Sequence, residues 1–146
     1  MKQVQKILFP IDFASNFETL VPWVETFADK FGATVYVLFV AQDLSNFATF
    51  YVPHSNIEDF QKQAIDSARK RMAAAVEEFF KKFPKLETRV ELGAPAEKIL
   101  EFVQKEKVDM IIMGAHGRKG LERAIFGSVA NKVIKSASCP VLAVHP

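Results

Sequence analysis

The chain has 146 residues, a length that supports one hydrophobic core but not two domains of ordinary size. Its 19 lysines and arginines nearly balance 17 aspartates and glutamates, and the net charge of +2 argues against a protein that coats nucleic acid. With 49% hydrophobic and 25% charged residues, the composition is that of a globular protein and excludes a disordered chain. We expect a single domain over residues 1–146, and the excess of 14 phenylalanines needs an explanation.

The chain also carries little that indicates an oxidising or membrane environment. Its single cysteine, Cys139, cannot form an intrachain disulfide and argues against a structural zinc cluster. The first residues lack the apolar stretch of a signal peptide, and no window approaches the roughly 18 uncharged apolar residues of a membrane-spanning helix. These features predict a cytoplasmic protein without membrane contact.

Short apolar runs alternate with amphipathic stretches along the whole chain. The predicted elements in chain order are a strand at 4–9, a helix at 15–31, a strand at 34–40, a helix at 57–83, a strand at 86–92, a helix at 96–105, a strand at 108–113, a helix at 126–137 and a strand at 140–144. This order predicts an α/β fold, with a five-stranded parallel sheet and helices on both faces.

Apolar residues recur at steps of three and four in the helices, which predicts their buried faces. The expected inward-facing residues are Leu20, Val24, Phe27, Ala28 and Phe31 in the first helix, Phe60, Ala64, Ala68, Met72, Val76, Phe79 and Phe83 in the second, and Val129, Val133 and Ile134 in the last. Core packing thus explains much of the phenylalanine excess. Phe13, Phe47, Phe50 and Phe126 lie near predicted loops, as candidates for a pocket wall or a partner surface.

Ligands of open α/β sheets bind at the carboxyl ends of strands, so the segments that follow the strands are the candidate site. Asp12 follows the first strand, and residues 114–120 (GAHGRKG) follow the fourth. Four of the six glycines fall within residues 114–127, where they let the backbone approach oxygen atoms of a ligand. Residues 114–146 carry a net charge of +4 against −2 for residues 1–113. The pattern predicts a phosphate site near Gly127 and Ser128, at a helix N-terminus.

Spacing alone leaves other interpretations of these residues open. Asp12 has equal claim as the cap of the following helix, and His116 by itself is typical of a surface loop. His54 and His145 have no metal-ligand spacing, and residues 69–71 indicate a solvated helix face. The chain contains no G-x-x-x-x-G-K-[ST] motif and no G-x-G-x-x-G after its first strand, which excludes a P-loop protein and a dinucleotide-binding fingerprint.

The stretch from Gly114 and Gly117 to Gly127 and Ser128 resembles the G-x2-G-x9-G-[ST] signature of the universal stress protein family. The opening strand that ends in Pro10-Ile11-Asp12 and the closing residues 139–144 (CPVLAV) are also similar to that family. The resemblance implies a universal stress protein domain over residues 1–146, with a Rossmann-like sheet of order 3-2-1-4-5 of the adenine nucleotide alpha-hydrolase-like type. It also implies ATP binding, because family members with the intact signature bind ATP.

The resemblance further assigns roles to residues of this chain. Asp12 would contact the ribose, Pro10 would shape the adenosine pocket, and the Val40 backbone would meet the adenine edge. Met113 and Gly114 would line the ribose and phosphate side, and the phosphates would be surrounded by His116, Gly117, Gly127, Ser128 and Val129. A divalent ion, Mg²⁺ or Mn²⁺, would be held by the phosphates and not by a protein cage.

The implied function is that of a nucleotide-dependent regulatory protein of the stress response. No residue pattern offers an activated nucleophile with its base, so the chain is expected to have no catalytic residues. The alternatives are a slow ATPase or autophosphorylating enzyme that uses His116 or Ser128, and an interaction scaffold with little nucleotide affinity. AMP or another adenine nucleotide is an alternative ligand, and nucleic acid is not an expected partner.

The last predicted strand is apolar and uncharged over Val141–Val144. An edge strand of this kind has to be covered in a soluble protein. Universal stress proteins dimerise through this strand, so both arguments predict an isologous homodimer.

Overall fold

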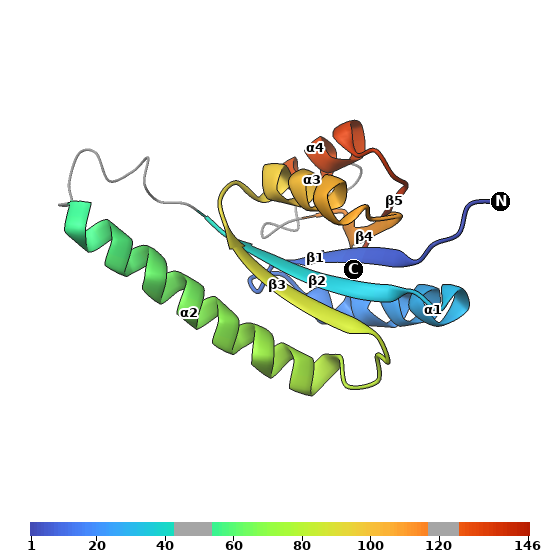
Figure 1. The fold of residues 1–146 in the computed structure, drawn as a ribbon, viewed down its shortest axis with the longest axis horizontal. Helices are drawn as coiled ribbons and strands as arrows, with labels where there is room; N and C mark the ends of the chain where they lie inside the picture. The colour runs from blue at the N-terminus through green and yellow to red at the C-terminus, as the bar shows by residue number, and fades with distance from the viewer. Residues whose placement is uncertain (43–53, 117–125) are drawn as a thin grey trace.

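The structure is a computed structural model that describes residues 1–42, 54–116 and 126–146 (Figure 1). Within these residues, five parallel strands form one sheet in the order β3-β2-β1-β4-β5. The strands are β1 (Lys6–Ile11), β2 (Thr34–Ala41), β3 (Leu86–Leu92), β4 (Met110–Gly114) and β5 (Val141–Val144). The helices are η1 (Phe17–Leu20), α1 (Val21–Phe31), α2 (His54–Phe79), α3 (Pro95–Glu106) and α4 (Ser128–Ser136). The predicted α/β fold and the implied strand order are confirmed.

The helices cover the sheet from both sides. Figure 1 shows α1 and α2 against one face and α3 and α4 against the other. The chain moves from β1 through β2 to β3 in one direction along the sheet, and from β3 to β4 and β5 in the opposite direction. Because each crossover between parallel strands is right-handed, the two directions of travel place their helices on opposite faces of the sheet. The direction therefore reverses between β1 and β4, which makes their carboxyl ends the topological switch point.

The central strand is buried on both of its faces. Ile7 and Phe9 contribute to the core beneath α1 and α2, whereas Leu8 contributes to the core beneath α3 and α4. All three side chains are fully buried, as expected for a strand of a parallel sheet that is covered on both sides.

The first helical segment differs from the prediction of one helix over 15–31. The 3₁₀ helix η1 comes first, and α1 begins one residue before Pro22. A residue without an N–H is tolerated in the first helical turn, so Pro22 favours a start at this position. Gly32 ends α1 in the left-handed conformation, at φ 62°, as the sequence predicts. The inward orientation predicted for Phe31 is wrong, because this side chain is 45% exposed at the end of the helix.

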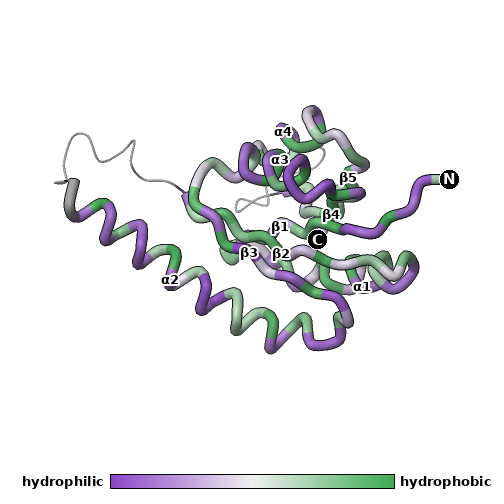
Figure 2. Tube along the Cα trace, viewed as in Figure 1, coloured by the Kyte–Doolittle hydropathy of each residue, from purple (hydrophilic) through white to green (hydrophobic). Residues whose placement is uncertain are grey.

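Helix α2 is longer than the sheet that it covers. Its 26 residues span about 39 Å, whereas the eight residues of β2 span about 26 Å. Figure 1 shows the first turns of α2 beyond the end of the sheet, and Figure 2 shows that hydrophobic and hydrophilic residues alternate along these turns as they do elsewhere in the helix. The burial predicted for Phe60 and Ala64 is therefore wrong: both are exposed.

The C-terminal end of α2 also differs from the prediction. The helix ends at Phe79 and not at Phe83, and the chain then turns with the Phe83 N–H donating to the Phe80 carbonyl oxygen. Phe80 and Phe83 are nevertheless buried, and Phe80 packs against Phe9 and Phe17. At α4, Val133 is buried as predicted, but the inward orientation predicted for Ile134 is wrong, because it neighbours Val133 in the helix and points to another side, where it is 38% exposed.

None of the helices in the described part of the chain is long and apolar enough to cross a membrane.

Candidate functional site

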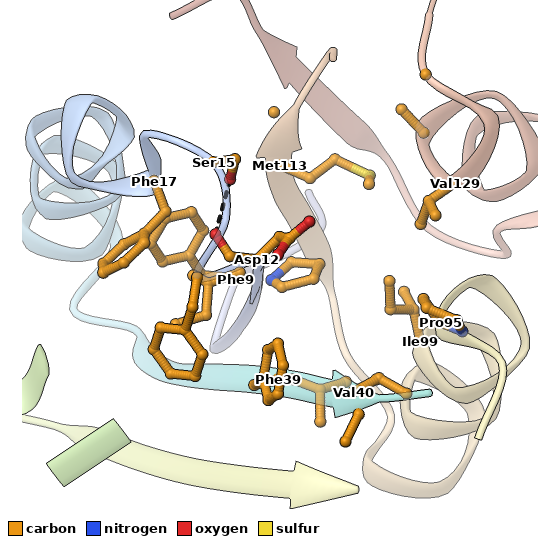
Figure 3. A pocket seen from close by; sticks show the side chains of 18 of the residues that line it. Phe9, Asp12, Ser15, Phe17, Phe39, Val40, Pro95, Ile99, Met113 and Val129 are labelled. Carbon is orange, nitrogen blue, oxygen red and sulfur yellow. Dashed lines mark hydrogen bonds between the residues drawn. The ribbon is translucent and has the colours of Figure 1, made fainter. Parts of the chain in front are cut away.

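A pocket of about 620 Å³ lies at the carboxyl ends of the strands, at the switch point (Figure 3). Its volume falls within the range of about 300–1,000 Å³ that is usual for small-molecule sites. The ladder between β1 and β4 pairs Ile7 with Met110 and Leu8 with Ile111, whereas β1 remains paired with β2 as far as Ile11. Pro10 has no N–H, so it cannot extend a ladder toward β4. The sequence at Pro10 thus favours the opening of the sheet where the pocket lies.

The structure brings together nearly all residues that the resemblance assigned to the site. The residues from this set that line the pocket are Pro10, Asp12, Val40, Met113, Gly114, His116, Gly127, Ser128 and Val129. Gly117 lies outside the described residues, as do Arg118, Lys119 and Arg123. The described set comes from three strands, one helix and the residues directly next to them, so the fold gathers residues that are more than 100 positions apart in the chain.

Asp12 lines one side of the pocket, half-buried directly after β1. Its carboxylate Oδ1 accepts a hydrogen bond from the Ala14 N–H at 2.9 Å, and its carbonyl oxygen accepts one from the Ser15 hydroxyl at 2.8 Å (Figure 3). The cap position of the following helix is occupied by Asn16. The alternative interpretation of Asp12 as a helix cap is therefore wrong, and its carboxylate is held at the pocket by the turn that follows.

The other polar side of the pocket is the start of α4. The Gly127 N–H donates to the Ala115 carbonyl oxygen at 2.8 Å, and the Ala115 N–H donates to the Val144 carbonyl oxygen at 2.9 Å. These two bonds join the ends of β4 and β5 to the first turn of α4. Gly127 and Ser128 both line the pocket, so the positive end of this helix dipole is directed to one side of it.

Two apolar walls complete the pocket. Phe13, Phe17 and Phe39 form an aromatic wall, with ring centroids 4.6 Å apart for Phe13 and Phe39 and 6.1 Å apart for Phe13 and Phe17. The interpretation of Phe13 as a wall residue is confirmed. Figure 3 shows Val129, Pro95 and Ile99 on the opposite side. Phe126 is 42% exposed and is not part of the lining, and Phe47 and Phe50 lie outside the described residues.

Arg71 is a pocket residue that the sequence did not indicate. Its guanidinium carbon lies 4.7 Å from the centroid of the Phe13 ring, in a cation–π contact, and its Nη2 donates to the Phe13 carbonyl oxygen at 3.5 Å. Residues 69–71 are exposed, as predicted, but Arg71 also lines the pocket. The available signal was the spacing of Ala64, Ser67 and Arg71, which places them on one face of α2 that lines the pocket.

The basic residues predicted to surround the phosphate site do not all lie at the pocket. Lys132 pairs with Glu97 of α3, with 3.3 Å between Nζ and Oε1, and neither Lys132 nor Lys135 lines the pocket. The contribution of these two lysines to a phosphate site is therefore limited to their longer-range field.

His145, to which the sequence gave no role, lies beside His116. The Nε2 atom of His116 is 3.1 Å from the Nδ1 atom of His145, and the ring centroids are 5.0 Å apart. The spacing of 29 positions carries no recognisable motif, because the two residues meet only through the pairing of β4 with β5.

A carboxylate on one side, a helix N-terminus on the other and apolar walls between them define an α/β protein with a ligand pocket at the switch point of its sheet. A model of the universal stress protein family matches residues 3–145. The chain is 37% identical over 142 residues to universal stress protein MJ0531 of Methanocaldococcus jannaschii, which covers 96% of this chain and 81% of that protein. The chain therefore belongs to the universal stress protein family.

Solved structures of the family have the same fold. The structure of MJ0577, a universal stress protein of the same organism, has a TM-score of 0.85 at 28% identity and covers 99% of this chain and 98% of that chain. The universal stress protein from Archaeoglobus fulgidus in complex with dAMP has a TM-score of 0.67 at 22% identity and covers 97% of this chain and 98% of that one.

Proposed function

We propose that this chain is an ATP-binding universal stress protein, in which nucleotide occupancy of the pocket regulates the interaction with a partner. The observation that carries the proposal is that nine of the residues assigned by the family resemblance line one pocket of about 620 Å³. In this proposal the adenosine half of ATP lies near Pro10, Asp12 and the Val40 backbone. The triphosphate lies toward Gly114 and the first turn of α4.

The carboxylate and the helix N-terminus give the pocket an orientation for the nucleotide. A carboxylate accepts hydrogen bonds from ribose hydroxyl groups and repels phosphates, so Asp12 favours the sugar at its side of the pocket. The backbone amides of the first turn of α4 that lack an intrahelical partner, together with the helix dipole, favour the phosphates. The aromatic wall around Phe13 and Phe39 offers apolar surface for the flat base.

Gly114 provides a separate argument for a ligand. A Cβ atom built at this position would lie 3.5 Å from the His116 carbonyl oxygen and 3.7 Å from Leu20 Cδ2, which are ordinary van der Waals distances. The packing of the described residues therefore does not require glycine at Gly114. A ligand that approaches the backbone closely would require it.

The relative solved with dAMP supports an adenine nucleotide as the ligand class, and the intact glycine signature supports ATP within that class. Mg²⁺ or Mn²⁺ would be held by the phosphates, since hard cations of this type keep several waters and bind through phosphate oxygens. In the described part of the chain, no group of three or more histidine, cysteine, aspartate or glutamate side chains is placed to hold a metal by itself.

A nucleotide series tests the proposal. We expect isothermal titration to show that ATP binds at least about tenfold more tightly than AMP, a difference of about 1.4 kcal/mol, because only ATP reaches the first turn of α4 with its terminal phosphates. Adenosine should bind weakly and GTP more weakly than ATP. Equal affinities for ATP and AMP would mean that the pocket does not recognise the terminal phosphates, which would contradict ATP as the specific ligand. If no adenine nucleotide bound, the whole proposal would be contradicted.

We further propose that the chain forms a homodimer through β5. The two edges of the sheet differ in charge: β3 carries Glu87, Arg89 and Glu91, whereas Val141–Val144 of β5 is uncharged. Charged edge strands resist pairing with another chain, and apolar ones favour it. The carbonyl oxygens of Pro140 and Val144 accept bonds from β4, so by alternation the N–H of Ala143 faces the open edge.

Substitution Ala143→Pro should therefore break the dimer and leave the β4–β5 ladder in place, because the lost N–H is the one directed away from β4. We expect a dimeric mass for the original chain and a monomeric mass for the variant in sedimentation at micromolar concentration. Circular dichroism of the variant serves as the control for folding. A monomeric original chain, or a folded variant that remains dimeric, would exclude this interface.

A further inference from the structure

Two histidines from neighbouring strand ends meet at the edge of the pocket. Gly114 pairs with Val144 in the sheet, and the bond from the Ala115 N–H to the Val144 carbonyl oxygen continues the ladder by one step. His116 and His145 follow directly after these residues. Both are thus fixed by the backbone of adjacent strands, and His116 and Pro146 line the pocket.

The distance between the two ring nitrogens fits a shared metal ion. Two ligands that each lie about 2.0–2.1 Å from a tetrahedral zinc ion are separated by about 3.3 Å, and the His116 Nε2 and His145 Nδ1 atoms are 3.1 Å apart. Imidazole nitrogens suit zinc, copper and nickel ions, whereas Mg²⁺ prefers oxygen ligands. Both Nε2 and Nδ1 serve as metal ligands in proteins.

We propose that His116 and His145 bind one divalent transition-metal ion of the zinc class at the edge of the pocket. In the described residues no third protein ligand completes the site, so the remaining positions are open to water or to a ligand in the pocket. This histidine pair is distinct from the oxygen-bound Mg²⁺ or Mn²⁺ described above, because it selects for nitrogen-preferring metals. A phosphate oxygen of ATP would be an additional ligand, and only this last point rests on the proposed function.

The lone thiol is the obvious competing zinc ligand in this chain. Burial and the nearby Asp109 carboxylate raise the pKa of the Cys139 thiol above its ordinary value. A thiol ligates metal as the thiolate, so this shift disfavours Cys139 as the binding group at neutral pH. The substitution Cys139→Ser therefore distinguishes zinc binding by the histidine pair from zinc binding by the thiol.

The first test uses the full-length, untagged protein without nucleotide, titrated with Zn²⁺. We expect one ion per chain with micromolar affinity, at least about tenfold weaker binding in His145→Ala, and unchanged binding in His54→Ala, which removes the third histidine. Co²⁺ should give a visible d–d absorption without a thiolate charge-transfer band, and Cys139→Ser should leave it unchanged. Equal zinc affinity of His145→Ala and the original chain, or no zinc binding, would overturn the site and leave the pair as a hydrogen bond.

The second test adds nucleotide. Zn²⁺ at saturating concentration should raise the affinity for ATP at least about fivefold, with no such effect on adenosine or on ATP binding by His145→Ala. The metal-free ATP affinity of His145→Ala should equal that of the original chain. If the chain binds zinc but not ATP, the proposed function is refuted and the metal site is retained. If it binds ATP but not zinc, the metal site is refuted and the proposed function is retained.

Discussion

Substitution Gly127→Glu should weaken ATP binding by at least about 100-fold, or about 2.7 kcal/mol, because it places a carboxylate and its side chain where the phosphates are expected. Gly127 is the N-cap residue of α4 and lines the pocket. Its φ of −56° is accessible to any residue, so the backbone does not require glycine at this position. The binding loss would therefore come from the occupied anion site and not from a strained chain.

The same substitution should leave the protein as stable as before or slightly more stable. A negative charge at a helix N-terminus interacts favourably with the helix dipole, by about 0.3–1 kcal/mol. Opposite effects on binding and on stability are specific to an anion site at a helix start, since a substitution that damaged the fold would lower both. Calorimetric melting of the variant without nucleotide measures the second quantity, and isothermal titration with ATP measures the first.

Asn131→Glu provides the matched control for this prediction. Asn131 lies one turn further along α4, is exposed and does not line the pocket, and the substitution makes the same change in net charge. We expect its ATP affinity to stay within about threefold of the original value, because a charge on a solvent-exposed side chain outside the pocket interacts only weakly through water. If Gly127→Glu and Asn131→Glu bind ATP equally well, the phosphates do not lie at the start of α4.

Substitution Phe80→Ala should destabilise the fold by about 3–5 kcal/mol, the usual cost of removing a buried phenylalanine. Phe80 is 1% exposed, and its ring lies 6.1 Å from Phe9, 6.4 Å from Phe17 and 5.5 Å from Phe83, measured between centroids. The substitution removes one member of this aromatic cluster and leaves a cavity beneath α2. Against a total stability of about 5–15 kcal/mol, a loss of this size is a large fraction.

Phe60→Ala is the control, because it deletes the same ring near the other end of α2, at a site that is 62% exposed. We expect its effect on the free energy of unfolding to stay within about 0.5 kcal/mol. Urea unfolding at one protein concentration compares both variants with the original chain. Equal losses at the two sites would mean that the first turns of α2 are covered in solution, which contradicts their exposure in this structure.

These two phenylalanines show where sequence periodicity is sufficient and where it fails. The three- and four-residue spacing of α2 marks an apolar face along the helix, but it contains no information about where the sheet beneath that face ends. The helix is longer than the strands, so Phe60 has no sheet to pack against. Phe80 was not among the predicted core residues: the pattern was continued through Phe79 and Phe83 of a helix that in the structure ends at Phe79.

The candidate site likewise contains residues that the sequence indicates and residues that only tertiary packing brings there. Glycine spacing, Asp12 and Ser128 are local features, and a resemblance in sequence is enough to assemble them into one site. Arg71 and His145 enter the neighbourhood of the pocket from a different helix and from the far end of the chain. Neither belongs to a local motif, so only the packing of α2 beside Phe13 and the pairing of β4 with β5 bring them there.

The sequence alone determined the alternation of strands and helices and the parallel sheet, and its resemblance to a family assigned nine described residues of the pocket. These properties depend on periodicity, on Gly and Pro positions and on short motifs, all of which act between residues that are near in the chain. The tertiary structure decided how far each helix is covered, which phenylalanines are buried, and that Arg71 and His145 lie close to the candidate site. Those properties depend on contacts between distant segments, whose geometry exists only once the sheet has formed and its two faces have been covered.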